Sequence, residues 1–355
     1  MVMNGQSVPP TIAVTILDPR CDSDWGRLIV SHPAVNFFHT AAWAEVVCKT
    51  YGHRPIYLRF SQQGESVALI PLIEVLSPFT GRRGVCLPFS DFCAPLVFDG
   101  NRLRLVMDEL CKLAQERRWK YFEIRGEPAF ETAAEPVTTF YGHKLDLRRG
   151  SEELFDRFSD GTKGAIRKAE RSNLTVEVLR TRDAVLQFYQ LHVETRKRHG
   201  LPPQPASFFL NIHQSIIETG LGFVVLAKRG LHPIAGAVFF KFGKRSIYKF
   251  AASNYAYREF CGNNLALWEG IKFLVQEGGE LLHFGRTPLD NDGLRRFKLS
   301  WAAEEETISY FRFGTARRAW ITARQDVATF HNKLFRRLPV RANRLLGTMI
   351  YPHLH

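Results

Sequence analysis

The chain of 355 residues is long enough for two domains, and its hydrophobic share of 45% is ordinary for a globular protein. No stretch reaches the ~18 consecutive apolar residues of a membrane span, and the first residues lack the basic and apolar regions of a secretory signal, so we expect a cytoplasmic protein. The net charge of +13 favours anionic partners such as a nucleotide-bearing substrate, transfer RNA, coenzyme A or anionic lipid, although a plain basic surface explains it equally well.

The first half of the chain predicts a hairpin, a helix and a strand. Residues 56–75 consist of two arms rich in β-branched and aromatic residues around a polar turn, which is typical of a β-hairpin. Residues 101–120 repeat apolar positions at helical spacing, and residues 121–126 (YFEIRG) predict a short strand. This order defines one α/β unit.

A polar run after residue 147 marks the boundary with a second unit. Residues 160–173 predict a basic helix, and residues 181–200 predict a second helix that Thr181 caps and Gly200 ends. The sequence LPPQP (201–205) is a rigid break. The boundary therefore separates two segments of domain size.

The second half repeats the order of the first. Residues 223–242 predict a hairpin, residues 263–279 a largely buried helix, and residues 281–286 (LLHFGR) a short strand. We interpret the repeat as a tandem duplication of an α/β unit, with chance similarity between common hairpins as the alternative.

Three segments follow from these patterns. Residues 1–147 form a first domain, residues 148–314 a second domain that ends in the alternating strand 304–314, and residues 315–355 a basic helical segment. The apolar residues of the last segment need cover, so we expect it to pack on the first domain. Contact with a membrane surface is the alternative.

Several kinds of site are missing from the sequence. There is no phosphate-binding loop of the G-x-x-x-x-G-K-S/T type, no G-x-S-x-G turn and no H-E-x-x-H pair. The six cysteines are scattered without a C-x-x-C pair, which indicates reduced thiols rather than disulfides or zinc. We therefore predict no metal site.

One candidate donor site lies at the start of the second predicted helix. Gly262 lets a ligand approach the backbone, Asn263 or Asn264 can cap the helix, and the free N–H groups of its first turn favour an anion. Arg258 would add a charge-assisted contact. The alternative is a plain turn that caps a core helix.

The segment 284–301 (FGRTPLDNDGLRRFKLSW) is a second candidate. Its glycines and Pro288 predict a loop at the end of a buried strand, where open α/β sheets usually bind ligands. Lys298 lies between Phe297 and Leu299, and its ammonium can stabilise the oxyanion of an acyl-transfer intermediate. The alternative is a solvated basic loop.

The second half resembles the FemAB-type transferases and their relatives in the GNAT superfamily. The resemblance rests on several weak motifs in a specific order, which span most of residues 37–301. In the second half these are residues 160–178, 191–205, 233–254, 262–273 and 283–301, and in the first half residues 37–47, 87–96 and 120–126. The set is most similar to the FemAB-like proteins of exosortase and exopolysaccharide systems.

This resemblance implies an α/β (α+β) fold of two tandem GNAT-like domains, each with a mixed, mostly antiparallel sheet flanked by helices. It implies that Lys298, in the segment Gly293-Leu-Arg-Arg-Phe-Lys298, stabilises the oxyanion. The donor would bind near Arg258, Gly262, Asn263 and Asn264. The predicted acceptor contacts are Arg167, Lys168, Arg196, Arg198, Asp91 and Arg286, although Asp91 also suits a turn or a helix cap.

The resemblance implies transfer of an acyl or aminoacyl group to an amine or hydroxyl of a cell-envelope or polysaccharide precursor, which is anionic or lipid-linked. The donor would be a co-substrate, aminoacyl-tRNA or acyl-CoA, with no permanently bound cofactor. Both donors stay open, because the sequence has neither the coiled-coil arm of some aminoacyl-tRNA users nor the usual spacing of the coenzyme A loop. The alternatives are an acetyl-CoA-dependent N-acetyltransferase and a non-catalytic protein that binds anionic polymer or RNA. Such an enzyme would work in the cytoplasm or at the inner face of the membrane.

Overall fold

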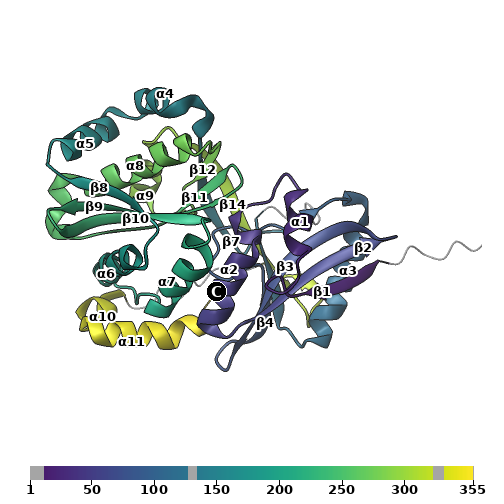
Figure 1. Cartoon of the computed structure of the whole chain (residues 1–355). Coiled ribbons are helices and arrows are strands. Elements are labelled where there is room, and N and C mark those ends of the chain that lie inside the picture. The colour runs from purple at the N-terminus through teal and green to yellow at the C-terminus, as the bar shows by residue number, and fades with distance from the viewer. Residues whose placement is uncertain (1–11, 127–133, 323–331, 355) are drawn as a thin grey trace, which may run out of the picture.

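A computed structural model describes residues 12–126, 134–322 and 332–354 of the chain. A single 15-stranded sheet runs through these residues, and helices cover both of its faces (Figure 1). The sheet is mostly antiparallel, as expected for the fold class.

The first unit begins with an antiparallel arrangement of β1 to β4 and ends with the helix α3 and the strands β6 and β7. Its hairpin of β2 and β3 turns at Gly64, whose positive φ of 89° suits glycine. The helix α3 is shorter than predicted, because Arg118 adopts a left-handed conformation and Trp119 turns into the core. The elements are β1 (Ala13–Leu17), α1 (Trp25–Val30), η1 (Phe37–His39), α2 (Ala41–Tyr51), β2 (Arg54–Gln62), β3 (Glu65–Ser77), β4 (Gly81–Val85), β5 (Leu96–Val97), η2 (Gly100–Arg102), α3 (Leu103–Glu116), β6 (Tyr121–Arg125) and β7 (Thr138–Asp146).

The second unit repeats this order and packs its central helix tightly on the sheet. A Cβ atom at Gly270 of α8 would lie 2.3 Å from the ring of Phe239, so only glycine allows this approach. The elements are η3 (Leu147–Arg149), α4 (Gly150–Arg157), α5 (Asp160–Glu170), β8 (Thr175–Leu179), α6 (Arg182–Arg198), α7 (Ala206–Ile212), η4 (His213–Ile217), β9 (Gly222–Arg229), β10 (His232–Phe242), β11 (Arg245–Ser253), η5 (Tyr255–Phe260), α8 (Gly262–Gln276), β12 (Leu281–His283), β13 (Thr287–Pro288), α9 (Asp292–Leu299), β14 (Glu304–Gly314) and β15 (Ala319–Trp320).

The two units exchange their last strands. Strand β7 of the first unit pairs with β12 of the second, and β14 of the second unit pairs with β6 of the first. The two exchanged strands also pair with each other along seven residue positions, from Glu304↔Lys144 to Tyr310↔Thr138. The sheet is therefore continuous across residue 147, where the sequence predicts the domain boundary, and neither half completes its own sheet.

The C-terminal helices contact both units. They are α10 (Asn332–Arg337), α11 (Val340–Ile350) and the turn η6 (Tyr351–His353). The sequence predicts this segment on the first domain, but α11 lies along α6 of the second unit, and its Gly347 would place a Cβ atom 2.1 Å from the carbonyl oxygen of Pro203 (Figure 1). Its last turn, η6, reaches the first unit at β3. Residues 1–11, 127–133, 323–331 and 355 of the predicted segments lie outside the described part.

Candidate active site

The central sheet opens between two parallel strands of the second unit. Strands β11 and β12 pair only from Arg245↔Leu281 to Ile247↔His283. Beyond these positions β11 continues to Ser253, while the chain after β12 turns away at Gly285, whose φ is +69°, and follows β7. The two strands thus diverge, and the side chains of the opening come from both units.

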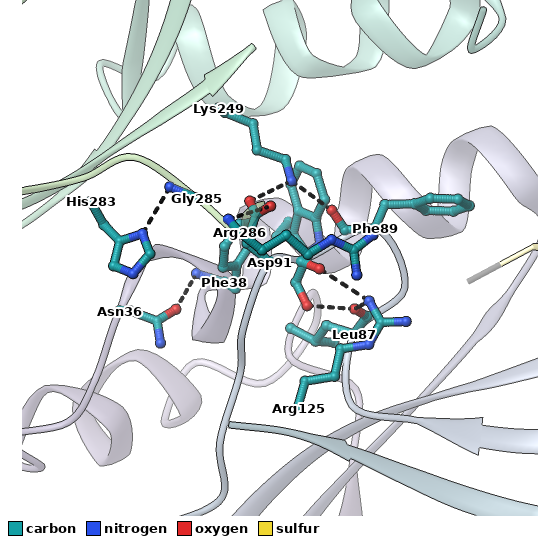
Figure 2. A network of polar contacts seen from close by, with 12 residues as sticks. Asn36, Phe38, Leu87, Phe89, Asp91, Arg125, Lys249, His283, Gly285 and Arg286 are labelled. Carbon is teal, nitrogen blue, oxygen red and sulfur yellow. Dashed lines mark hydrogen bonds and ion pairs between the residues drawn. The ribbon is translucent and has the colours of Figure 1, made fainter. Parts of the chain in front are cut away.

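A buried ion pair between the units fills this opening. The Lys249 ammonium of β11 lies 2.7 Å from Asp91 Oδ2 and donates to the carbonyl oxygen of Phe89 at 2.8 Å (Figure 2). Burial raises the pKa of Asp91, but the positive charges of Lys249 and Arg286 outweigh it and hold this pKa below its ordinary value. Asp91 is therefore ionised at neutral pH. Its backbone lies in the bend that follows the turn at residues 88–89, and its side chain pairs with Lys249.

Lys298 lies beside this pair in a short helix rather than in a solvated loop. The side chain of Asn291 accepts from the N–H of Leu294 at 3.1 Å and caps α9, which the glycines and Pro288 of the segment did not reveal. Lys298 is only 3% exposed, and its Nζ donates to the carbonyl oxygens of Gly285 and Arg286 at 2.9 and 3.1 Å. Burial lowers the pKa of Lys298 to about 8, against the opposing charge of Asp91.

Arg286 and Tyr310 connect the opening to the exchanged strand β14. Arg286 Nη1 donates to the Tyr310 hydroxyl at 2.7 Å, and that hydroxyl donates to the backbone oxygen of Asp91 at 2.8 Å. The Arg286 guanidinium also lies 4.7 Å from the centre of the Phe140 ring. Asp91 thus faces three cations, of which the sequence predicts Arg286 and Lys298 at the site but misses Lys249.

A cavity of about 460 Å³ lies between the two units, next to this centre. Its lining includes His283 from β12, Glu306 from β14, and Asn36, Phe92 and Lys144 from the first unit. Nδ1 of His283 accepts the backbone N–H of Gly285 at 2.8 Å, so Nε2 carries the proton and donates to Glu306 at 2.9 Å. The second carboxylate oxygen of Glu306 pairs with Lys144.

Burial and hydrogen bonds set the protonation states of His283 and Glu306. Burial lowers the pKa of His283 and keeps its imidazole neutral. Burial raises the pKa of Glu306, but the hydrogen bonds from His283 and Lys144 outweigh it and lower this pKa overall. Glu306 is therefore a carboxylate at neutral pH. The sequence predicts neither residue, because their pairing joins positions 23 residues apart through the sheet.

The start of α8 brings predicted donor and acceptor residues together. Arg198 donates to the carbonyl oxygen of Ser253 at 3.1 Å, Asn263 donates to the hydroxyl of the same residue at 3.1 Å, and Arg198 and Arg258 both stack on the Tyr255 ring. Gly262 is buried and begins the helix. Asn263 and Asn264 do not cap it, because the helix has already begun before them and Cys261, in a left-handed conformation, occupies the cap position.

The remaining predicted acceptor residues lie apart from the opening. Arg167 and Lys168 are exposed on α5, where Arg167 stacks on Phe155. Arg196 donates to Pro202 and to the hydroxyl of Tyr351, so its guanidinium holds the C-terminal segment rather than facing the cavity. The structure therefore groups Asp91, Arg286 and Lys298 at one place and Arg198, Arg258 and Asn263 at another.

Comparison with known proteins identifies the second unit. Residues 156–305, which contain α8, the sheet opening and Lys298, match the model of the acetyltransferase (GNAT) domain family. The chain carries a GNAT domain and is an acyltransferase. No curated protein matches the chain in sequence.

Solved structures with a similar fold cover most of the chain. FemX superimposes with a TM-score of 0.66 at 16% identity, over 83% of this chain and 96% of its own. A tandem GNAT protein from the clavulanic acid biosynthesis pathway gives 0.57 at 9% identity, over 86% and 98%. The N-myristoyltransferase of Saccharomyces cerevisiae, solved with bound myristoyl-CoA, gives 0.51 at 12% identity, over 88% and 81%. These neighbours confirm the predicted GNAT-like fold.

Proposed function

We propose that this acyltransferase moves an acyl or aminoacyl group to an amine or hydroxyl of a cell-envelope or polysaccharide precursor, with the Lys298 ammonium stabilising the oxyanion. The observation that carries the proposal is the position of this ammonium: it is buried at the sheet opening of the GNAT domain, beside the cavity between the units. Two of its three N–H groups are held by the carbonyl oxygens of Gly285 and Arg286. We assign the third to the oxygen of the reacting carbonyl.

The chemical step requires few protein groups. The acceptor nitrogen or oxygen attacks the donor carbonyl carbon, whose oxygen becomes negative and receives the third N–H of Lys298. When this intermediate collapses, the bond from carbon to the leaving sulfur or oxygen breaks, and the acceptor's proton passes to that leaving atom, which departs as a thiol or hydroxyl. Glu306 lines the cavity as a carboxylate, but its lowered pKa makes it a weak base. We therefore assign it the binding of the acceptor N–H or O–H.

The start of α8 supports a place for the donor. The first-turn N–H groups of this 15-residue helix carry partial positive charge, and the guanidiniums of Arg198 and Arg258 lie beside them on Tyr255. A donor phosphate, from coenzyme A or from the end of a transfer RNA, would find complementary charge here. The matched family is described as acetyltransferases, which supports acyl-CoA as the second candidate donor beside aminoacyl-tRNA. The same description favours an enzyme over a non-catalytic binding protein.

The replacement Lys298→Met tests the catalytic assignment. Loss of one oxyanion donor lowers the rate by ~10²-fold or more, so we expect transfer to fall by at least that factor while circular dichroism shows a folded protein. Lys112→Met, at a side chain that is 61% exposed on α3, serves as the control and should retain full transfer. A Lys298→Met protein within about threefold of the wild type contradicts the assignment.

Calorimetry identifies the donor independently of Lys298. Acetyl-CoA and an aminoacyl-tRNA are titrated separately into the wild-type protein and into Arg258→Gln. We expect one of the two to bind, and to bind at least about fivefold more weakly to the variant, because a charge-assisted contact is lost. If neither donor binds, the proposal of acyl transfer from these donors is wrong.

A further inference from the structure

Large apolar side chains are exposed on two segments that lie far apart in the sequence. Leu76, near the end of β3, is 51% exposed, and Phe79, in the turn between β3 and β4, is 80% exposed. On α11, Leu345 is 63% and Met349 is 61% exposed. Exposed side chains of this size are costly in water when they are grouped, so a group of them usually indicates an interaction site.

The two segments are neighbours in the folded chain. The ring of Phe79 packs edge-on against His353 at 5.0 Å, directly after α11, and Arg83 donates to the carbonyl oxygen of His353 at 2.7 Å. Both segments lie along the lower edge of the molecule in Figure 1. Helix α11 turns its buried residues, Asn343 and Gly347, toward the 201–203 segment, so Leu345 and Met349 lie on the face that points away from the protein.

Positive charge surrounds these apolar side chains. Arg336, Arg337, Arg341 and Arg344 are all exposed, and none of them forms an ion pair within the described residues. The Arg344 guanidinium also lies over the ring of Tyr189 on α6, at 5.3 Å. The sequence from 332 to 354 contains no Asp or Glu. The surface therefore combines apolar side chains with uncompensated arginines. We call it the α11 surface, and its members are Leu76, Phe79, Arg336, Arg337, Arg341, Arg344, Leu345 and Met349.

We propose that the α11 surface docks the protein on a lipid bilayer with anionic headgroups. Phe79, Leu345 and Met349 would enter the headgroup region, and the arginines would contact the anionic lipids. A nucleic acid would also attract the arginines, but it offers no apolar phase for Leu345 and Met349. The combination of charge and exposed aliphatic side chains therefore favours a bilayer. This inference concerns where the enzyme works and does not depend on which donor it uses.

Flotation with lipid vesicles tests the proposal. Full-length protein is mixed with vesicles of phosphatidylcholine alone or with about a third of phosphatidylglycerol, and we expect binding to the anionic vesicles only. The double variant Leu345→Glu/Met349→Glu should bind at least about tenfold more weakly, because two carboxylates replace the inserted side chains. Arg341→Gln/Arg344→Gln should weaken binding by about fivefold per arginine, and added salt should weaken the wild type.

A matched control separates docking from general stickiness. Val30 at the end of α1 is 64% exposed, close to the value for Leu345, and Figure 1 shows α1 away from α11. Val30→Glu should leave vesicle binding unchanged. The proposal is overturned if the wild type does not bind anionic vesicles, or if Val30→Glu weakens vesicle binding as much as Leu345→Glu/Met349→Glu does. It is also overturned if a short RNA binds more tightly than the vesicles and Leu345→Glu/Met349→Glu leaves the RNA binding intact.

Discussion

The two units carry similar sheet openings, but in the part of the chain that the structure describes only the first is closed by a backbone bridge. In the first unit the parallel strands β4 and β6 pair only at Gly84↔Phe122 and Val85↔Glu123. The backbone then closes this opening, because Cys93 forms a bridge with Arg125 and its N–H donates to the Arg125 carbonyl at 2.7 Å. In the second unit no such bridge joins β11 beyond Ile247 within the described residues, and side chains fill the gap.

The charged side chains at the two openings also differ in how they are paired. In the first unit Arg125 is 1% exposed, and its Nε donates to Glu123 at 2.8 Å. Its Nη1 donates to the carbonyl oxygens of Leu87 and Ser90. Arg312 donates to the second carboxylate oxygen of Glu123. In the second unit one carboxylate, Asp91, faces Lys249, Arg286 and Lys298. Duplication thus provides two equivalent openings. The first is closed by backbone and paired charge, and the second can attract a developing negative charge.

The largest expected effect comes from removing the carboxylate of each opening. Asp91→Asn leaves Lys249 buried without its partner, and loss of one member of a buried pair costs about 3–5 kcal/mol of unfolding free energy. Glu123→Gln should cost less, because the Arg125 guanidinium keeps two carbonyl contacts, whereas the Lys249 ammonium keeps one, to Phe89. Urea unfolding measures both. The double variant Asp91→Asn/Lys249→Met should recover part of the loss, and simple additivity would contradict the pairing.

The same variant has a second readout at the active site. Because Asp91 raises the pKa of Lys298, Asp91→Asn should lower that pKa below about 8. Transfer that needs the ammonium falls as the pH rises through this pKa, so the alkaline limb of the pH–rate profile should move to lower pH. If the alkaline limb of the pH–rate profile stays at the same pH in a folded Asp91→Asn protein, the titration of Lys298 does not determine that limb.

The next effect concerns one buried histidine in each unit. Burial lowers the pKa of His39 to about 4 and that of His192 to about 3, from an ordinary 6.5. Below pH 6.5 these histidines bind protons in the unfolded chain but stay neutral in the folded chain. The free energy of unfolding therefore decreases as the pH falls, by about 2 kcal/mol per histidine at pH 5. His192→Phe should reduce the loss between pH 7 and 5 by that amount in urea titrations. His232→Phe, at an exposed ring on β10, should not change it.

The smallest effect compares the glycines that end β6 and β12. Both approach the 91–94 segment: a Cβ atom at Gly126 would lie 2.9 Å from Ala94 Cβ, and one at Gly285 would lie 3.3 Å from Asp91. Both have positive φ, so alanine costs about 1–2 kcal/mol of unfolding free energy at either position. Only Gly285→Ala should also lower transfer, because Asp91 and the carbonyl that holds Lys298 must shift. Equal activity of the two variants in a folded state would remove the functional distinction between the openings.

Local patterns in the sequence anticipate the elements well and the site only in part. The strand 304–314 and the hairpins were predictable because alternation and turn residues act over a few positions. The helix α9 was missed because the glycines and Pro288 suggest a loop, and its cap became visible only in the structure. Lys298 was found through the resemblance, whereas Lys249, His283 and Glu306 lie in strands where no local signal marks them.

The sequence by itself determined the duplicated order of hairpin, helix and strand, the GNAT-like fold and the basic character of the C-terminal segment. Tertiary structure alone decided the exchange of β7 and β14, the pairing of Lys249 with Asp91 across 158 positions, and the meeting of Phe79 with α11. The physical reason is the distance along the sequence over which each interaction acts. Periodicity, caps and turns depend on neighbours in the chain, while a buried charge needs a partner that only the closed sheet brings within reach.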